Sequence, residues 1–173
     1  MNISLAKIIN RMAVRDQEMR KKAAKSGIWD LKIDQINTEN MKKIIKENGW
    51  PTISLAGKKA SRNAWLLAQH ADCDKDFQKK CLSLMLIVFR NNPNDIAKEN
   101  IAYLKDRILI NEGKKQLFGT QFITNKQNNK LTPRPIKDIK NLEKRRKEYN
   151  LPLFLDYLEM AKSHNSKQIK NIG

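Results

Sequence analysis

The residue of this sequence best suited to proton transfer is His70. It lies in the stretch NAWLLAQHADCD (residues 63–74), where apolar residues at helical spacing predict a helix, and Leu66 precedes it by one turn. Histidine has an ordinary pKa near neutrality, so His70 could act as a general acid or base. A histidine beside an apolar helix face is also a common core residue, and both interpretations stay open at this point.

Three carboxylates are candidates for orienting His70, namely Asp72, Asp74 and Asp106. A carboxylate that accepts a hydrogen bond from an imidazole determines which ring nitrogen carries the proton. A metal shared by His70 and Asp72 is a weaker alternative, because side chains two residues apart diverge on a helix. The sequence also lacks the GxxxxGKS/T, GxGxxG, GxSxG and HExxH motifs. We therefore expect no metal and no cofactor.

A second group of candidates lies in LKDRILINEGKKQLFGTQF (residues 104–122). Asp106 and Arg107 are adjacent, so on a helix their side chains point about 100° apart and do not pair with each other. The planar guanidinium of Arg107 matches a phosphate or a carboxylate. We predict that Asp106 and Arg107, with His70, are catalytic. An ion pair between helices is the alternative for Arg107.

Five further residues are predicted to bind a substrate through amide, hydroxyl or ring groups. Gly119 lets the backbone turn, and amide side chains on such a loop both donate and accept hydrogen bonds, which suits recognition of a nucleobase, an amide or a sugar. Trp50, in the turn GWPT (residues 49–52), is expected to pack as a lid beside the next element. An ordinary hairpin that satisfies its own backbone is the alternative for the loop. The predicted set is Trp50, Gln69, Gln116, Thr120 and Gln121.

The elements that must position these residues are mostly helices. Apolar spacing, caps and breakers predict helices over residues 3–25, 38–48, 54 or 58–71, 75–90, 93–113, 138–150 and from 152 onward. Residues 29–33 alternate and are expected to form an extended connector, and a short hairpin or ordered loop is expected near 114–136. The sequence thus predicts a mainly α protein, a single helical domain of six or seven helices over residues 1–173, with a frayed tail at 165–173.

The net charge of +17 is the strongest compositional signal. Such a chain attracts polyanions, which include nucleic acid, anionic lipid and acidic protein surfaces. The basic segment of residues 137–147 could follow phosphates along one helix face, or it could be a solvated face. Lysine, asparagine and isoleucine are all abundant, and an AT-rich coding sequence would raise the charge without any partner. The oligomeric state is not predicted.

The location of the protein follows from what its sequence lacks. No apolar run approaches the roughly 20 residues of a membrane span. The N-terminus has charges where a signal peptide needs an uninterrupted apolar stretch. We expect a cytoplasmic protein, and export by a route that reads no N-terminal signal stays open.

Five motifs in a fixed order resemble an uncharacterised bacterial family known only as a domain of unknown function. The motifs are GWPT (49–52), QHAD (69–72), AYLKDRI (102–108), GKKQLFGTQ (113–121) and PRPIKD (133–138), and the resemblance extends from Asn40 to Leu158. It implies no activity, cofactor or substrate. The signature positions that it implies are Trp50, Gln69, His70, Asp106, Arg107, Gln116, Gly119, Thr120 and Gln121.

Two functions are consistent with these residues. The first is a hydrolase or group-transfer enzyme in which His70 is the general acid or base and Arg107 holds an anionic, phosphate- or carboxylate-bearing substrate. The second is a non-catalytic basic module that binds nucleic acid or an acidic protein partner. We expect the partner to be an anionic small molecule or a polyanion in either case.

Overall fold

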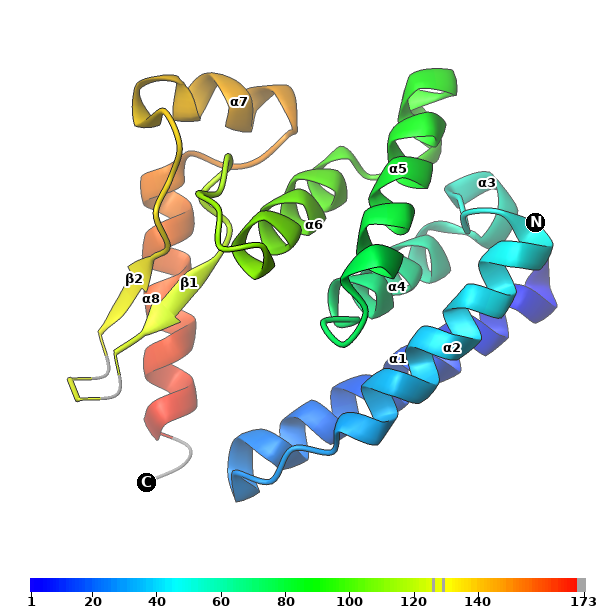
Figure 1. Ribbon diagram of the computed structural model, residues 1–173, viewed down its shortest axis with the longest axis horizontal. Coiled ribbons are helices and arrows are strands. Elements are labelled where there is room, and N and C mark those ends of the chain that lie inside the picture. Colours follow the sequence, from blue (N-terminus) through cyan, green and yellow to red (C-terminus); the bar gives the residue numbers. More distant parts are fainter. Residues whose placement is uncertain (126, 129, 171–173) are drawn as a thin grey trace. The chain divides into compact units, whose positions relative to one another are not determined.

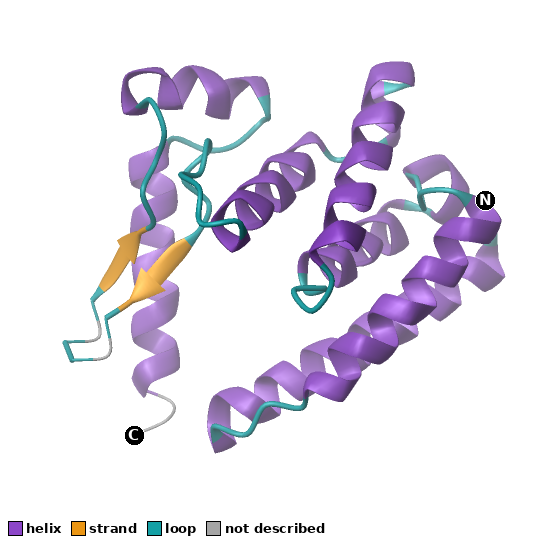
Figure 2. Cartoon of the chain, in the orientation of Figure 1, coloured by secondary structure: helices purple, strands orange, loops and turns teal. Residues whose placement is uncertain are grey.

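The computed structural model describes residues 1–125, 127–128 and 130–170 of the chain. Within them helix dominates, as Figure 2 shows, and the only sheet is a small antiparallel pair of strands. The prediction of a mainly α protein is therefore confirmed. The chain forms two compact units, residues 1–104 and 105–173, and the division falls inside one helix. The expectation of one domain over residues 1–173 stays a prediction.

The elements follow one another along the chain with short connections. In order they are α1 (Ile3–Ser26), α2 (Leu31–Asn48), α3 (Ile53–Ala56), α4 (Lys58–Gln69), α5 (Lys75–Asn91), η1 (Pro93–Asp95), α6 (Lys98–Asn111), β1 (Phe122–Thr124), β2 (Leu131–Pro133), η2 (Ile139–Asn141), α7 (Leu142–Glu148) and α8 (Phe154–Lys170).

In the first unit, α1 packs beside α2 and α4 (Figure 1). The Asn2 side chain caps α1 by accepting a hydrogen bond from the Leu5 N–H, and Gly27 ends the helix with a left-handed backbone (φ 71°). The predicted helix over residues 3–25 is thus confirmed. The buried positions of α1 recur at alternating spacings of four and three, which places them on one face: Leu5, Ile9, Met12, Asp16, Met19 and Ala23.

The second helix begins earlier than predicted. Asp30 takes the cap position of α2 and accepts a hydrogen bond from the Lys32 N–H at 3.0 Å. The helix therefore starts at Leu31, and the predicted extended connector over residues 29–33 is wrong. The reason is that a good capping residue after Gly27 starts a new helix as soon as the chain has turned.

Gly57 divides the predicted third helix into α3 and α4, because its φ of 82° lies outside the helical region. Asp74 then caps α5 by accepting from the Phe77 N–H at 2.8 Å. Pro93 opens the short η1 turn, while the predicted fifth helix begins only at Lys98. His70 lies at the end of α4, directly before the turn that leads into α5.

In the second unit, β1 and β2 form the predicted hairpin, with Phe122 opposite Pro133 and Thr124 opposite Leu131. Gln116 forms an isolated bridge with Ile136, which closes the base of this segment. The predicted helix over residues 138–150 begins as η2 and continues as α7. Asp138, the expected cap, makes no capping hydrogen bond with its side chain.

The C-terminal helix α8 continues through Lys170. The predicted frayed tail overlaps this helix at residues 165–170, and its last residues, 171–173, lie outside the described part of the chain. No helix among the described residues is both long and apolar enough to cross a membrane.

Candidate functional site

A buried aspartate on α1 is the centre of the polar cluster in the first unit. Asp16 is fully buried, and it occupies a position that the apolar stripe of α1 would give to a hydrophobic residue. An ionised carboxylate in such a place is costly unless several donors face it. The donors must therefore come from the elements that pack on this face.

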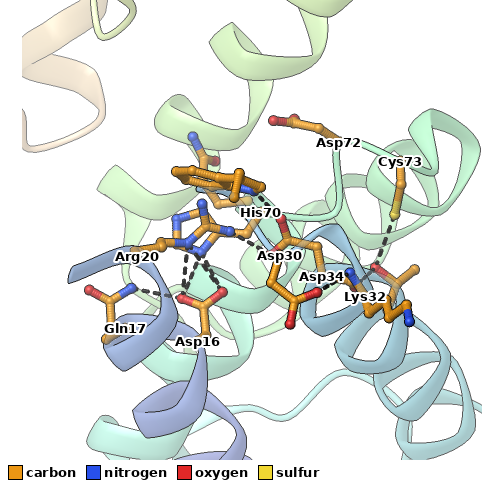
Figure 3. Close-up of polar contacts among 12 residues, drawn as sticks. Asp16, Gln17, Arg20, Asp30, Lys32, Asp34, His70, Asp72 and Cys73 are labelled. Carbon is orange, nitrogen blue, oxygen red and sulfur yellow. Dashed lines mark hydrogen bonds and ion pairs between the residues drawn. The ribbon is translucent and has the colours of Figure 1, made fainter. Parts of the chain in front are cut away.

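His70 supplies one of these donors from the end of α4. Its Nδ1 lies 2.9 Å from Asp16 Oδ2 and 3.0 Å from Asp16 Oδ1, and Figure 3 shows the imidazole directed at the carboxylate. An ionised carboxylate only accepts hydrogen bonds, so Nδ1 carries the proton and Nε2 keeps its lone pair when the ring is neutral. The His70 side chain is 16% exposed, and no hydrogen bond from the described residues reaches Nε2.

Arg20 joins this pair to a second carboxylate. Its Nε lies 3.2 Å from Asp16, and its Nη2 lies 2.7 Å from Asp34 Oδ1 on α2 (Figure 3). The Arg20 guanidinium also lies 4.9 Å from the centre of the Trp29 ring, whose Nε1 is 3.5 Å from Asp34. Gln17 completes the set with a hydrogen bond of 2.7 Å to Asp16.

The hydrogen bonds and charges of the cluster keep Asp16 ionised. Burial would by itself raise the pKa of Asp16, but the hydrogen bonds from His70, Arg20 and Gln17 and the charge of His70 outweigh it and hold that pKa below its usual range. For Asp34, burial is the larger effect and raises its pKa despite Arg20. With Asp16 and Asp34 ionised and Arg20 positively charged, these three groups and His70 carry a net charge of −1 when His70 is neutral. The net charge is zero when His70 is protonated.

The predicted orienting carboxylates have other partners in the structure. Asp74 caps α5 and forms an ion pair of 2.8 Å with Lys42. Asp72 accepts a hydrogen bond from Gln78 Nε2 at 3.1 Å. The carboxylate bonded to His70 Nδ1 is Asp16, which the sequence interpretation did not consider because it lies 54 residues away.

Two of the predicted substrate-binding residues lie in the interior of the first unit. Trp50 is 4% exposed, and its Nε1 is buried without a hydrogen-bond partner among the described residues. Gln69, which precedes His70, is also buried. Its Oε1 has no hydrogen-bond partner among the described residues. Trp50 therefore packs as a core side chain beside the turn that precedes α3.

In the second unit, Asp106 organises the loop after α6. The carboxylate is fully buried and accepts hydrogen bonds from the backbone amides of Leu117, Phe118 and Thr120, at 2.7 to 3.1 Å, and from the Thr120 hydroxyl at 3.0 Å. Burial raises the pKa of Asp106, and the amide donors oppose this effect. Asp106 and Thr120 thus hold the loop in shape.

The other predicted residues of this unit belong to the same loop. The Gln116 side chain donates to the carbonyl oxygens of Gln121 and Arg134 and accepts from the Gln121 N–H at 2.8 Å. Gln121 Nε2 donates to Thr120 Oγ1, and its Oε1 lies 3.5 Å from Arg107 Nη1. Gln116 therefore pairs with the backbone, while Arg107 and Gln121 are the members of this group that keep partial exposure.

The basic segment of residues 137–147 is only partly a charged surface. Arg145 donates to the carbonyl oxygens of Leu117, Lys137 and Asp138. Arg146 is 1% exposed and donates to the carbonyl oxygen of Pro152. Both arginines thus tie α7 to neighbouring chain segments, which leaves the lysines as the exposed positive charges of this segment.

No group of three metal-ligating side chains gathers anywhere in the described part of the chain. Burial raises the pKa of Cys81 to about 12, so it stays a thiol at neutral pH. Cys73 is exposed, and its Sγ lies 3.7 Å from Thr38 Oγ1.

The sequence did contain a signal for the residues that were missed. Asp16 falls at a core position of the spacing that the interpretation used for Met12 and Met19, and a lone charge at such a position requires buried partners. The same argument applies to Asp34, which lies on the buried face of α2 with Met41. Periodicity could thus have identified both acids, although it could not have named His70 and Arg20 as their partners.

Comparison with known proteins gives a family without a function. A family model described as "Family of unknown function (DUF6624)" matches residues 5–170. No curated protein and no solved structure matches the chain. The function of the chain is therefore inferred from its own residues.

Proposed function

The chain belongs to the family of unknown function DUF6624, and we propose from its own geometry that it is a hydrolase or group-transfer enzyme with His70 as the general acid or base. The proposal is supported by one observation. His70 Nδ1 is hydrogen-bonded to the buried carboxylate of Asp16, which leaves Nε2 as the basic atom of a partly exposed ring.

The proposed step is proton transfer to Nε2. A water molecule or a substrate hydroxyl gives its proton to His70 Nε2 while its oxygen forms a bond to the phosphorus or carbonyl carbon of the substrate. The leaving oxygen or nitrogen then takes the proton back from His70 as its bond breaks. Asp16 stabilises the imidazolium between the two transfers, Arg20 helps to keep Asp16 ionised, and Asp34 holds the Arg20 guanidinium in place. Asp16, Arg20 and Asp34 are positioning residues.

A water molecule or a substrate hydroxyl is the proposed nucleophile because none of the described serine or cysteine side chains is bonded to His70. The predicted role of Arg107, which is to hold an anionic phosphate or carboxylate, is a separate proposal that concerns the second unit alone. It stands on the planar donor set of the guanidinium and on its partial exposure. Replacement of Arg107 with methionine tests it independently of His70.

The reactivity of His70 can be measured without a known substrate. Diethyl pyrocarbonate acylates a histidine nitrogen that has a free lone pair and is accessible, and peptide mass spectrometry distinguishes His70 from His164. We expect His70 to react in the folded protein. A His70 that reacts only after denaturation would contradict the proposal.

Catalysis itself is tested with two activated compounds, 4-nitrophenyl phosphate and succinyl-4-nitroanilide. We expect hydrolysis of one of them, with His70→Gln lowering the rate roughly 100-fold or more and Asp16→Asn lowering it less. His164→Gln is the matched control, because it removes the other histidine. Equal rates for the folded wild type and His70→Gln would refute a catalytic role.

A further inference from the structure

A hollow separate from the His70 cluster lies between α4 and the first half of α6, and the residues that line it all fall within residues 1–104. Its volume is about 490 Å³, which is in the usual range for a small-molecule site. The side chains that matter for its chemistry are Lys58, Ser61, Arg62, Trp65, Asn100 and Tyr103. His70 and Asp16 are not among the residues that line it.

Two buried polar side chains line this hollow without internal partners. Ser61 is 5% exposed and Asn100 is 6% exposed, and neither side chain forms a hydrogen bond within the described part of the chain. Buried polar side chains normally have a hydrogen-bond partner. A hydroxyl on α4 and an amide on α6 therefore remain available to a molecule in the hollow, to which the amide can both donate and accept.

The α4 side of the hollow attracts an anion. Lys58 and Arg62 lie one turn apart on this helix, both are exposed, and neither is paired with a carboxylate among the described residues. They stand in the first two turns of α4, and Gly57 gives this end of the helix no side-chain cap. The positive end of the helix dipole adds to their charge.

The α6 side has a different character. Glu99, in the first turn of α6, also lines the hollow and disfavours a second anionic group there. The rings of Trp65 and Tyr103 lie 5.8 Å apart at 57° to each other and give the hollow an aromatic wall. Such a wall binds a flat, apolar group. The charge and the flat surface thus lie on different parts of one hollow.

The geometry points to a binding site for a small molecule that joins one phosphate or carboxylate to a planar ring. The anionic group contacts Lys58 and Arg62, the ring packs against Trp65 and Tyr103, and Ser61 and Asn100 hydrogen-bond the polar atoms between them. This binding site does not depend on the proposed catalytic role of His70, because His70 does not line the hollow. A binding measurement with His70→Gln tests the binding site separately from catalysis.

Calorimetry with four named probes tests the site: adenosine 5′-monophosphate, benzoate, neutral adenosine and inorganic phosphate. We expect adenosine 5′-monophosphate or benzoate to bind. If the site prefers a phosphate, only adenosine 5′-monophosphate binds, and if it prefers a carboxylate, only benzoate binds. Adenosine and inorganic phosphate should each bind more weakly, because each lacks half of the ligand. His70→Gln should leave binding unchanged.

Matched variants locate the binding. Lys58→Gln and Arg62→Gln should each weaken it roughly tenfold, as expected for loss of one charge-assisted hydrogen bond. Lys59→Gln removes the same charge from the neighbouring exposed residue, which does not line the hollow, and should change affinity less than about twofold. Asn100→Leu tests the buried amide, with its urea midpoint as the check on folding.

Four results would overturn the site. The first is the absence of binding heat from both adenosine 5′-monophosphate and benzoate at about 10 mM, and the second is an equal loss of affinity in Lys59→Gln and Arg62→Gln. The third is adenosine that binds as tightly as its monophosphate, and the fourth is loss of binding in folded His70→Gln. Inorganic phosphate that binds as tightly as the ring compounds would refute the aromatic half of the assignment.

Discussion

Among the described residues, each of the two units contains one fully buried aspartate, and the two aspartates differ in what surrounds the carboxylate. Asp106 accepts hydrogen bonds from backbone amides and a hydroxyl, none of which titrates near neutrality. Asp16 accepts from the ionisable side chains of His70 and Arg20, which keep 16% and 18% of their surface exposed. The same residue type thus shapes a loop in one unit and holds a proton-accepting ring in the other.

The comparison shows how donor type decides the state of a buried acid. Burial is the largest effect on the pKa of each carboxyl and acts upward in both. At Asp16 the hydrogen bonds and charge of His70, with the hydrogen bonds from Arg20 and Gln17, reverse that effect, whereas at Asp106 the neutral donors only reduce it. Charged donors therefore help to keep Asp16 ionised, whereas neutral donors leave the pKa of Asp106 raised.

The largest expected effect is the loss of the Asp106 carboxylate. Asp106→Ala leaves three buried amides and a hydroxyl without their acceptor, so we expect the free energy of unfolding to fall by about 4 kcal/mol. Urea denaturation followed by circular dichroism measures it. Asp106→Asn, which keeps one acceptor oxygen, should cost less. A loss below about 1 kcal/mol for the alanine variant would mean that the loop forms without this residue.

The same loop should tolerate no side chain at Gly119. Its φ is +70°, and a Cβ there would lie 2.7 Å from the Phe154 ring, so Gly119→Ala combines backbone strain with overpacking and should cost about 3 kcal/mol. Gly113 has the same backbone conformation (φ +73°) with open space around it, and Gly113→Ala should cost only about 1 kcal/mol. Equal losses in thermal unfolding would show that Phe154 moves aside.

Asp16→Asn should cost less than Asp106→Ala, because its donors can turn toward water. We expect a loss of about 2 kcal/mol, measured by the same urea titration. Asp16→Asn also changes the surroundings of His70, because the proton on His70 Nδ1 no longer faces a full negative charge. Nitrogen-15 shifts of the imidazole should therefore move in Asp16→Asn and stay unchanged in Asp106→Asn. Unchanged shifts in Asp16→Asn would show that Asp16 does not control the ring.

The sequence predicted the helical class and the hairpin correctly because both depend on local signals, namely apolar spacing, capping residues and turn residues. It predicted His70 as a candidate from residue type alone. It did not pair Asp16 with His70, since the contact joins α1 to the end of α4 and no local pattern encodes a partner 54 residues away. For Asp106, residue type suggested chemistry, whereas its hydrogen bonds to backbone amides depend on a loop shape that only the fold provides.

The smallest expected effect is a shift in acid stability. The pKa of Asp16 is lower in the folded chain than in the unfolded one, so its contribution is complete above about pH 4 and is lost as the pH falls from there through the folded pKa. His70→Gln removes the charge that helps to lower this pKa, so less of the contribution remains and acid unfolding should begin at a higher pH, by about 0.5 unit. The raised pKa of Asp106 has the opposite sign, because acidification favours its folded form. His164→Gln is the control, and acid titrations that coincide for His70→Gln and wild type would show that Asp16 owes its ionised state to Arg20 and Gln17.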